Sequence, residues 1–445
     1  MNFFLEKTYI IIAILLSATA CGNSKETPSD TKFESAHSIA LEARITEGKI
    51  LSKATEESEI KEEIKEQLLY TIGQLNGFGG GVDMNRLTTD LKISDVPSGG
   101  EERVVEYSSQ LFVSWPRGLY IPDTIDFYVP KTGSYQGLSA FFDEFGSDEN
   151  SGKKCLAAET HDVSQAILWY YYRPEKIGCP IVSVTEFESD SIVTLNASLK
   201  VSEENTENKF PEYDKVWEDE KLVITAIFGK AEYGAQSNWD AGVRGYKNTY
   251  REIIKLFGEP ASTNLDNGNP SVVNNETRLT FETEQGLVDI HLFLIDDIKY
   301  VDADFRAKYN ARTKISDFTS YSGHSGLGAN IRALAKMGKV EKGHYQIFLI
   351  NGCDTFAYVD DSLRQAHLDE NPDSGMDKYV DVITNAMPAY FHAMPRANLA
   401  VIEGLFGKTK NYREILSGFD AYQKAAVTGE QDNSWPLAFD APVEL

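Results

Sequence analysis

Two apolar runs within residues 318–356 constrain the fold most, because each ends at a residue that can carry chemistry. The first run leads to His324 and the second to Cys353, and the segment between them places Ile331 and Leu334 at helical spacing. A strand, a helix and a strand of this length form a right-handed crossover between parallel neighbours. Both strands then end at the same sheet edge, where open α/β sheets build their sites. We therefore expect the imidazole and the thiol to lie close together, an arrangement that activates a cysteine nucleophile.

The surrounding pattern extends this unit over residues 221–430. It begins with a fully apolar strand at 221–229, and strands and helices then follow one another at regular spacing. The expected elements are a helix at 242–258, a strand pair at 277–295, a helix at 303–318, a strand at 379–390 that ends near Asn385, and helices at 394–406 and 410–426. This order predicts an α/β three-layer sandwich with a mostly parallel sheet.

Residues 56–203 follow a different pattern and predict a separate α+β domain with mainly antiparallel strands. The pattern indicates a helix at 56–75, two strands within 102–129 that turn at 116–118 as a hairpin, a short helix at 137–145, and strands at 180–188 and 191–201. The aromatic segment 166–174 is expected to be a core strand, with an exposed binding face as the alternative. A polar linker, 204–220, joins the two domains, and 431–445 is a tail.

The N-terminus contains an export signal. An apolar run too short to span a bilayer ends in small residues before Cys21, and residues 1–20 resemble a bacterial lipoprotein signal peptide. Cys21 would carry the lipid and anchor the protein in the cell envelope, in the outer membrane if the host is Gram-negative. An ordinary secretory signal cleaved nearby is the alternative. Residues 21–55 are expected to be a polar tether, with a helix over 38–53 as a variant.

The four cysteines divide into groups by position. Cys21 is the lipidation site that the resemblance implies, and Cys155 and Cys179 are expected to form a disulfide in an oxidising compartment. Cys353 is then left as an unpaired thiol in an exported protein. Burial in the core would explain it, since free cysteine is among the most buried residue types, and catalysis is the alternative explanation.

Charge and missing motifs exclude several classes of function. The formal net charge of −25 argues against binding to nucleic acid or to anionic lipid. The chain lacks an HExxH motif, paired CxxC motifs and a phosphate-binding loop, so we expect neither a metal nor a cofactor. The acidic segment 360–377 could hold Ca²⁺, but a solvated acidic loop is the preferred interpretation. His291 lies inside an apolar strand and is expected to be a core histidine with its hydrogen bonds satisfied.

The order of these elements resembles the caspase, legumain, gingipain and clostripain type of cysteine peptidase. The resemblance covers residues 221–430 and rests on a buried first strand, a strand ending at a Gly-flanked His324, a helix, and a strand ending at Gly352-Cys353. It implies that His324 is the base, that Cys353 is the nucleophile, and that Gly326 with the Cys353 amide donates to the oxyanion. Asp354 and Asn385 are candidate substrate-pocket residues at the same edge.

Two alternative functions are therefore consistent with the sequence. The first is an envelope-anchored cysteine hydrolase, most simply an endopeptidase that acts on a protein or peptide substrate. The second is a non-catalytic lipoprotein that keeps the peptidase-like fold for binding a partner or for envelope structure. They differ in whether the Cys353 thiol is accessible and acidic.

Overall fold

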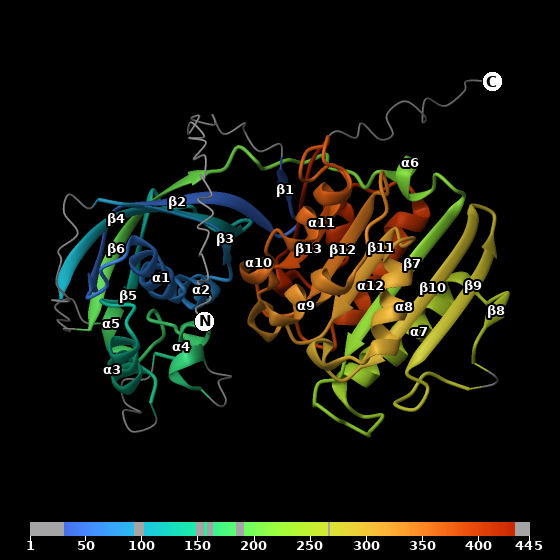
Figure 1. Cartoon of the computed structure of the whole chain (residues 1–445), viewed down its shortest axis with the longest axis horizontal. Helices are drawn as coiled ribbons and strands as arrows, with labels where there is room; N and C mark the ends of the chain where they lie inside the picture. Colours follow the sequence, from blue (N-terminus) through green and yellow to red (C-terminus); the bar gives the residue numbers. More distant parts are fainter. Residues whose placement is uncertain are drawn as a thin grey trace, which may run out of the picture.

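The computed structural model of the protein describes residues 31–92, 102–147, 155–157, 163–183, 191–265 and 268–431. The predicted signal peptide, Cys21 and residues 432–445 of the predicted tail lie outside these ranges. The described residues form a large mixed sheet and a separate antiparallel sheet, each packed against helices (Figure 1). We refer to the large sheet with its helices as the large-sheet half and to the other as the small-sheet half.

The large sheet has nine strands, and its central five are parallel. In spatial order the strands are β1 (Lys32–Glu34), β14 (Ala425–Gly429), β13 (Val380–Asn385), β12 (Gln346–Asn351), β11 (Phe318–Ser322), β7 (Lys221–Gly229), β10 (Gly286–Ile295), β9 (Glu276–Thr283) and β8 (Ser262–Thr263). The outer strands on both sides pair antiparallel. The sheet is therefore mixed, and the prediction of a mostly parallel sheet holds only for its centre.

Helices cover both faces of the large sheet. On one face Leu222 and Ile224 pack in the same core as α7 (Ala241–Phe257), α12 (Met394–Gly407) and α13 (Tyr412–Leu416). On the other face Ile227 packs with α8 (Ala303–Thr313) and α9 (Ala329–Met337), and α11 (Ser362–Glu370) lies over β13. Alternate side chains of a strand point to opposite faces, which is why neighbouring residues enter different cores.

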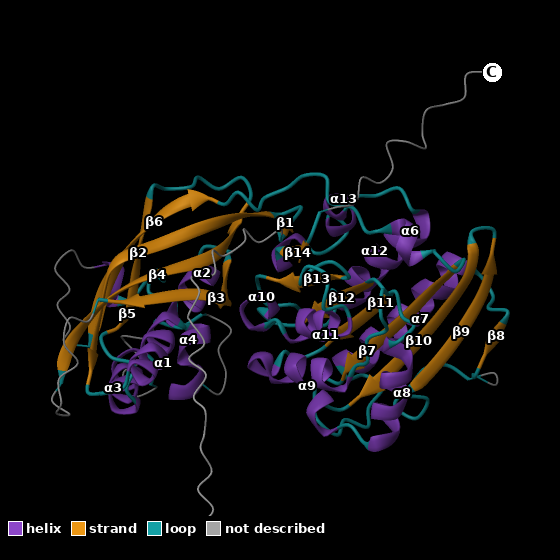
Figure 2. Ribbon diagram, turned by 45° about the horizontal axis from the view of Figure 1, so that its top comes forward, coloured by secondary structure: helices purple, strands orange, loops and turns teal. Residues whose placement is uncertain are grey.

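The small sheet has five antiparallel strands. Their order is β3 (Gly81–Leu91), β4 (Arg103–Pro116), β2 (Ser38–Ser52), β6 (Ile192–Val201) and β5 (Thr124–Pro130). One apolar core joins the sheet to α1 (Glu57–Leu68), α2 (Tyr70–Gly77), α3 (Tyr135–Phe145) and α4 (Leu168–Tyr171) (Figure 2). The predicted disulfide between Cys155 and Cys179 is confirmed, and it closes the loop that contains α4.

Short helical turns complete the chain. They are η2 (Gln165–Ile167), α5 (Pro180–Ser183), α6 (Tyr213–Val216), η3 (Ile298–Tyr300), η4 (Gly326–Gly328), α10 (Thr355–Tyr358) and η5 (Ala421–Gln423). Among them, α10 follows Cys353 directly and therefore bears on the candidate site.

The prediction of a tether over 21–55, or of a helix over 38–53, is wrong for residues 32–52. Leu41, Ala43 and Ile45 are buried at alternate positions of β2, as in a strand with one buried face. The register against β4 shifts between Ile45 and Gly48, and this bulge interrupts the alternation in the sequence. β1 pairs with β14, so this short segment belongs to the sheet predicted for 221–430.

Three predictions within 102–188 are also wrong. The strands β4 and β5 do not form a hairpin, because β2 and β6 lie between them in the sheet. The segment 166–174 is not a strand, because it is helical as far as Tyr171. Arg173 holds this turn through its Nη1, which donates to the carbonyl oxygens of Gly73, Tyr170 and Tyr172. Residues 180–183 form α5 instead of a strand, and 184–190 lie outside the described residues.

Two predictions in the large-sheet half need correction. The acidic segment 360–377 contains the helix α11 instead of forming a loop throughout. The segment 410–426 is not one helix, because α13 ends at Leu416 and β14 begins at Ala425. β14 is a five-residue strand whose partners β1 and β13 are distant in sequence, so the local pattern does not indicate it.

The small-sheet half packs against the edge of the large sheet at which the central strands end. Phe112 of β4, Phe33 of β1 and Phe356 of α10 form one aromatic cluster, with ring centroids 6.0 to 6.3 Å apart. A Cβ added to Gly81 of β3 would lie 2.4 Å from the Ala386 carbonyl oxygen, so only glycine allows this close approach. The junction is thus apolar and closely packed. There α10 lies beside β3 (Figure 1).

Candidate functional site

The ends of β11 and β12 bring His324 and Cys353 to equivalent positions. Ser322 lies opposite Asn351 in the parallel register, and the Gly323 N–H donates to the Asn351 carbonyl oxygen at 3.1 Å. His324 and Cys353 each follow a paired strand residue by two positions. Neighbouring strands lie about 4.8 Å apart, so the two residues start from adjacent points on the sheet edge.

His324 presents an exposed ring with a defined orientation. Its Nε2 lies 2.9 Å from the Ala231 carbonyl oxygen, just beyond the end of β7. A carbonyl can only accept, so this contact places the ring proton on Nε2 and leaves Nδ1 as an acceptor. Phe391 packs edge-on against the ring, with centroids 5.2 Å apart. The geometry therefore gives the imidazole the tautomer that a general base with a reactive Nδ1 would need.

The thiol of Cys353 is half-buried and neutral. It donates to the Ala389 carbonyl oxygen at 3.7 Å. Burial is the largest of the causes that raise the pKa of the thiol to about 11, and the neighbouring Asp354 carboxylate acts in the same direction. The hydroxyl of Tyr170 opposes this shift by hydrogen bonding, which lowers the pKa of Cys353. In this arrangement the sulfur is a protonated thiol at neutral pH.

The two candidate residues share a neighbouring segment but are not hydrogen-bonded to each other. Among the described residues, no hydrogen bond joins the His324 ring to the Cys353 sulfur. Phe391 touches the ring and Ala389 accepts from the thiol, and both belong to the turn after β13. The turn after β13 therefore lies against both candidate side chains.

The loop after His324 has an unusual backbone. Gly326, Leu327 and Gly328 all have positive φ, with values of 57°, 52° and 85°. Leu327 is a non-glycine residue in the left-handed region, which stores local strain of the kind that often accompanies functional loops. The side-chain amide of Asn330 and the Tyr321 hydroxyl both donate to the His324 carbonyl oxygen, at 2.7 and 2.8 Å. The loop is therefore held firmly beside the thiol.

Asp354 faces the small-sheet half rather than solvent. It is 1% exposed, and its Oδ1 accepts from Nδ2 of Asn76 in α2 at 2.8 Å. Burial raises the pKa of this carboxyl to about 6, partly offset by the hydrogen bonds from Asn76 and Tyr170. Asp354 therefore connects the turn that carries Cys353 to the small-sheet half. It does not line an open pocket.

Asn385 links strand ends beneath the thiol. Its Nδ2 donates to Oδ1 of Asn351 at 2.9 Å and to the Gly352 carbonyl oxygen at 3.1 Å. Gln423 donates to the same Asn351 oxygen at 2.9 Å. Asn385 is fully buried, so it supports the turn that carries Cys353 and has no surface to offer a substrate.

The sequence did not identify the residues that the small-sheet half contributes to the surroundings of Cys353. Hydrogen bonding by Tyr170 lowers the pKa of both Asp354 and Cys353. Trp169 packs edge-on against Tyr358 of α10, with ring centroids 6.1 Å apart. Both belong to the aromatic segment 166–174, for which a binding face was the alternative interpretation. Only the relative placement of the two sheets, which local pattern does not encode, brings this segment to the site.

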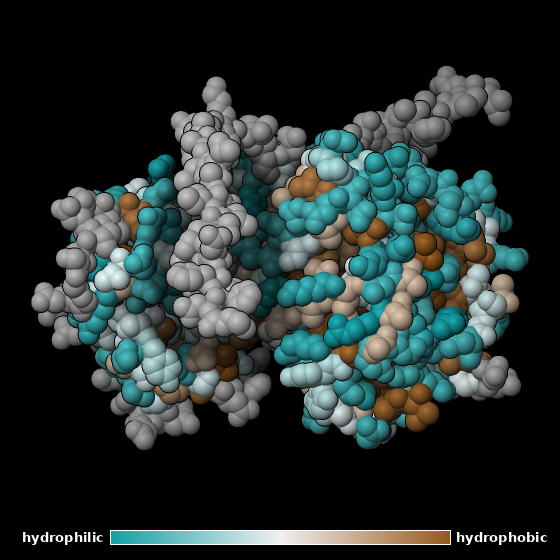
Figure 3. Space-filling model, in the orientation of Figure 1, coloured by the Kyte–Doolittle hydropathy of each residue, from teal (hydrophilic) through white to brown (hydrophobic). Residues whose placement is uncertain are grey.

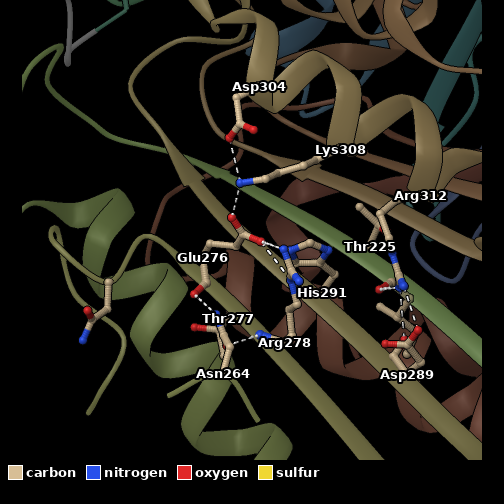
Figure 4. Close-up of polar contacts among 12 residues, drawn as sticks. Thr225, Asn264, Glu276, Thr277, Arg278, Asp289, His291, Asp304, Lys308 and Arg312 are labelled. Carbon is tan, nitrogen blue, oxygen red and sulfur yellow. Dashed lines mark hydrogen bonds and ion pairs between the residues drawn. The ribbon is translucent and has the colours of Figure 1, made fainter. Parts of the chain in front are cut away.

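A second cluster of polar residues lies between α8 and the strands β9 and β10 (Figure 4). Glu276 is its centre: it pairs with Lys308 at 2.7 Å, accepts from Nε2 of His291 at 3.0 Å and from Nε of Arg278 at 2.9 Å. Burial lowers the pKa of His291 to about 4. The prediction of a core histidine with a satisfied hydrogen bond is confirmed, and the balanced charges indicate a structural network that ties α8 to the sheet.

The described residues offer no metal site. No three His, Cys, Asp or Glu side chains among them form a group that could hold a metal ion. In the segment considered for Ca²⁺, Oδ1 of Asp377 accepts from Nε of Arg364 at 2.5 Å, so this carboxylate already has a cationic partner.

Hydrophilic side chains cover most of the large-sheet half on the face drawn in Figure 3.

No protein-family model matches the chain, and no curated protein matches it either. Among the helices of the described ranges, none combines the length and the apolar character that a membrane span requires. Function is therefore inferred from the geometry at the strand ends.

Proposed function

We propose that the protein is a cysteine hydrolase, most simply an endopeptidase, with Cys353 as nucleophile and His324 as base. The observation that carries the proposal is the register of β11 and β12, which starts both side chains from adjacent positions on one sheet edge. The hydrogen bond from His324 to the Ala231 carbonyl supports it, because a base oriented by a third group is the usual companion of an activated nucleophile. The order β10–β7–β11–β12–β13 is consistent with the caspase-like resemblance.

The proposed reaction proceeds through an acyl-enzyme. With the sulfur turned from Ala389 toward His324, Nδ1 takes the thiol proton and the thiolate attacks the carbonyl carbon of the scissile amide. The oxyanion of the tetrahedral intermediate accepts from the backbone N–H groups of Cys353 and Gly326. The imidazolium then gives its proton to the leaving amine as the C–N bond breaks. Water, deprotonated by the same imidazole, hydrolyses the thioester and regenerates the thiol.

We further propose that this activity belongs to an exported protein anchored by lipid at Cys21 in the bacterial cell envelope. Cys21 lies outside the described residues. The support for this part of the proposal comes from the lipoprotein-like sequence. The disulfide between Cys155 and Cys179 also supports export, because disulfides persist mainly in oxidising compartments. In this proposal the two halves act as two domains, and the small-sheet domain covers the site.

A specific observation favours the second candidate function, a non-catalytic lipoprotein that binds a partner. The thiol is protonated, is half-buried, and donates to Ala389 rather than to the imidazole. Alkylation with iodoacetamide at mildly acidic pH separates the two candidates. A catalytic thiol reacts within minutes at pH 6, whereas a structural thiol reacts only as the pH approaches the raised pKa.

The experiment that tests the hydrolase measures cleavage of a synthetic peptide library by mass spectrometry. The unaltered protein should cut a subset of the peptides, Cys353→Ala should abolish cutting, and His324→Gln should reduce the rate about 10²- to 10⁴-fold. His392→Gln is the matched control, since His392 is an exposed histidine in the neighbouring turn. Cutting that survives in Cys353→Ala would overturn the proposal, and so would the absence of cutting together with an unreactive thiol.

A further inference from the structure

A lysine and an aspartate are paired deep inside the large-sheet half. Lys209 lies in the connection between β6 and α6, and Asp381 is the second residue of β13 (Figure 1). Their side chains are 1% and 2% exposed, and Nζ of Lys209 lies 2.7 Å from Oδ1 of Asp381. Packed apolar side chains often stabilise a fold as well as such a pair does, because each buried charge has lost its water. Stability alone therefore does not account for the pair.

The surroundings of the Asp381 carboxyl group favour attack on its carbon. The hydroxyl groups of Tyr345 and Tyr412 both donate to Oδ2 of Asp381, at 2.5 and 2.7 Å. Gly429 of the neighbouring strand β14 leaves the space that Oδ1 occupies, since a Cβ added there would lie 1.8 Å from this oxygen. Two donors on one oxygen polarise the carboxyl group and stabilise negative charge that develops on that oxygen.

The backbone holds the amine of Lys209 beside this carboxyl group. The Lys209 N–H donates to Oε2 of Glu34 at 2.7 Å, and the Lys209 carbonyl oxygen accepts from the Tyr412 N–H at 2.8 Å. Nζ also donates to the carbonyl oxygen of Glu430. Groups that are held together in one geometry react as if they were present at a very high concentration.

Buried carboxyl groups nearby can exchange protons with the pair. Burial is the largest of the causes that raise the pKa of Glu212 to about 7, and the Asp381 charge acts in the same direction. Burial likewise raises the pKa of Glu34 to about 7. A carboxyl group that keeps its proton near neutral pH can act there as a general acid.

From these contacts we propose that Lys209 and Asp381 condense to an intramolecular amide with the loss of one water molecule. One proton first moves from Nζ to Oδ1, which leaves a neutral amine and a neutral carboxyl group. Nζ then attacks Cγ, and the two tyrosine hydroxyls stabilise the negative charge that develops on Oδ2. Glu212 gives its proton to the Oδ1 hydroxyl, which leaves as water, and takes one proton from Nζ.

The reaction is complete with the groups that the site contains. The bond between Nζ and Cγ forms, the bond between Cγ and Oδ1 breaks, and no oxidant or other reactant is consumed. The remaining N–H of the amide keeps the Glu430 carbonyl oxygen as its acceptor. The product ties the connection between β6 and α6 covalently to β13. Cys353 takes no part, so the proposal holds or fails independently of the proposed function.

The test is peptide mapping of the unaltered full chain by mass spectrometry, after reduction of the disulfide and digestion with trypsin. We expect a linked pair of peptides that contains residues 209 and 381, with the summed mass of the two peptides less one water molecule. Lys230 and Asp296 are the internal control: their ion pair is 2.8 Å long, but Asp296 is 42% exposed to water, so their peptides should stay unlinked. Unlinked peptides at residues 209 and 381 overturn the proposal.

Variants test the assigned roles. Lys209→Met lacks the amine and should yield only the unlinked peptide that contains Asp381. In protein made by cell-free synthesis, Tyr412→Phe and Glu212→Gln should each slow the appearance of the linked peptide about 10²-fold. Glu218→Gln, at an exposed position, is the matched control and should link at the unaltered rate. An unaltered rate in Glu212→Gln would contradict its role as the proton donor.

Discussion

At the scale of single residues, burial and the charge beside the sulfur together determine how readily Cys353 ionises. Asp354 is adjacent in sequence and buried, and its carboxylate raises the pKa of the thiol. Asp354→Asn removes the charge and keeps an oxygen that can accept from Asn76. We expect the midpoint of the pH profile for Cys353 alkylation to fall, with a rate at pH 9 several-fold higher. Asp360→Asn should leave the profile unchanged, and equal midpoints in Asp354→Asn and the unaltered protein would contradict the assignment.

His367 should make the protein less stable in acid. It is buried in α11, and neither ring nitrogen has a hydrogen-bond partner among the described residues. Burial, aided by His344, lowers the pKa of His367 to about 3. In the unfolded chain, His367 takes up a proton near pH 6.5, whereas the buried ring in the folded protein stays neutral. The stability that this neutral ring contributes is therefore complete above pH 6.5 and is lost as the pH falls toward 3.

His367→Phe should abolish that dependence. The ring of Phe348 already lies 6.3 Å away, so an aromatic replacement keeps an apolar contact. Between pH 7 and pH 5 the unaltered protein should lose about 2 kcal/mol more unfolding free energy than the variant, measured by urea denaturation. The exposed His392, replaced by Phe, serves as the control and should behave like the unaltered protein.

The sequence predicted which residues arrive at the sheet edge but not how they are used there. His324 and Cys353 follow from strand ends alone, because parallel neighbours bring their termini together. Asp354 and Asn385 were expected to line a pocket, and both are buried. Their roles depend on Asn76 and Gln423, partners 278 and 38 residues away in the chain, and local pattern carries no information on such contacts.

At the scale of elements, the disulfide-closed loop holds α4 against the site. Cys155 and Cys179 are separated by 24 residues and both are buried. Replacing both by Ala removes a constraint on the unfolded chain, so we expect a loss of about 3 kcal/mol in unfolding free energy. Loosening α4 also frees Tyr170, and iodoacetamide should then label Cys353 faster at pH 9. Faster labelling should appear as well when the unaltered protein is treated with a phosphine reductant, and constant labelling would contradict the role of the loop.

Elements with a strong local period were predicted and those that depend on distant pairing were not. The helices α7, α9 and α12 and the strands β7, β12 and β13 were expected near their observed positions. By contrast, β1 and β14 are three and five residues long, and their strand pairing, with each other and of β14 with β13, joins segments that are distant in the sequence. The bulge in β2 hid its period, and the aromatic helix α4 was expected to be a strand.

At the scale of the whole molecule, the aromatic cluster at the junction should couple the two halves. Phe112 contacts both Phe33 and Phe356, and its truncation opens a cavity in this cluster. Phe112→Ala should cost about 3–5 kcal/mol in unfolding free energy, measured by urea denaturation. Amide hydrogen exchange should rise in β3 and α10, which face each other across the junction.

Phe127→Ala is the matched control for this prediction. Phe127 is also fully buried, but it lies in the core of the small sheet and not at the junction. A similar loss of stability is expected without a selective rise of exchange in α10. If both variants loosen α10 equally, the cluster has no special part in joining the halves.

The hydrogen bond from Asn76 to Asp354 crosses the junction and ends one residue from the sulfur. Separation of the halves by a single layer of water would rehydrate the carboxyl and bring its pKa back toward 3.8. The same movement would lift Tyr170 from the thiol. A mechanical displacement of a few ångströms is thereby translated into a different acidity and a different accessibility of one sulfur atom.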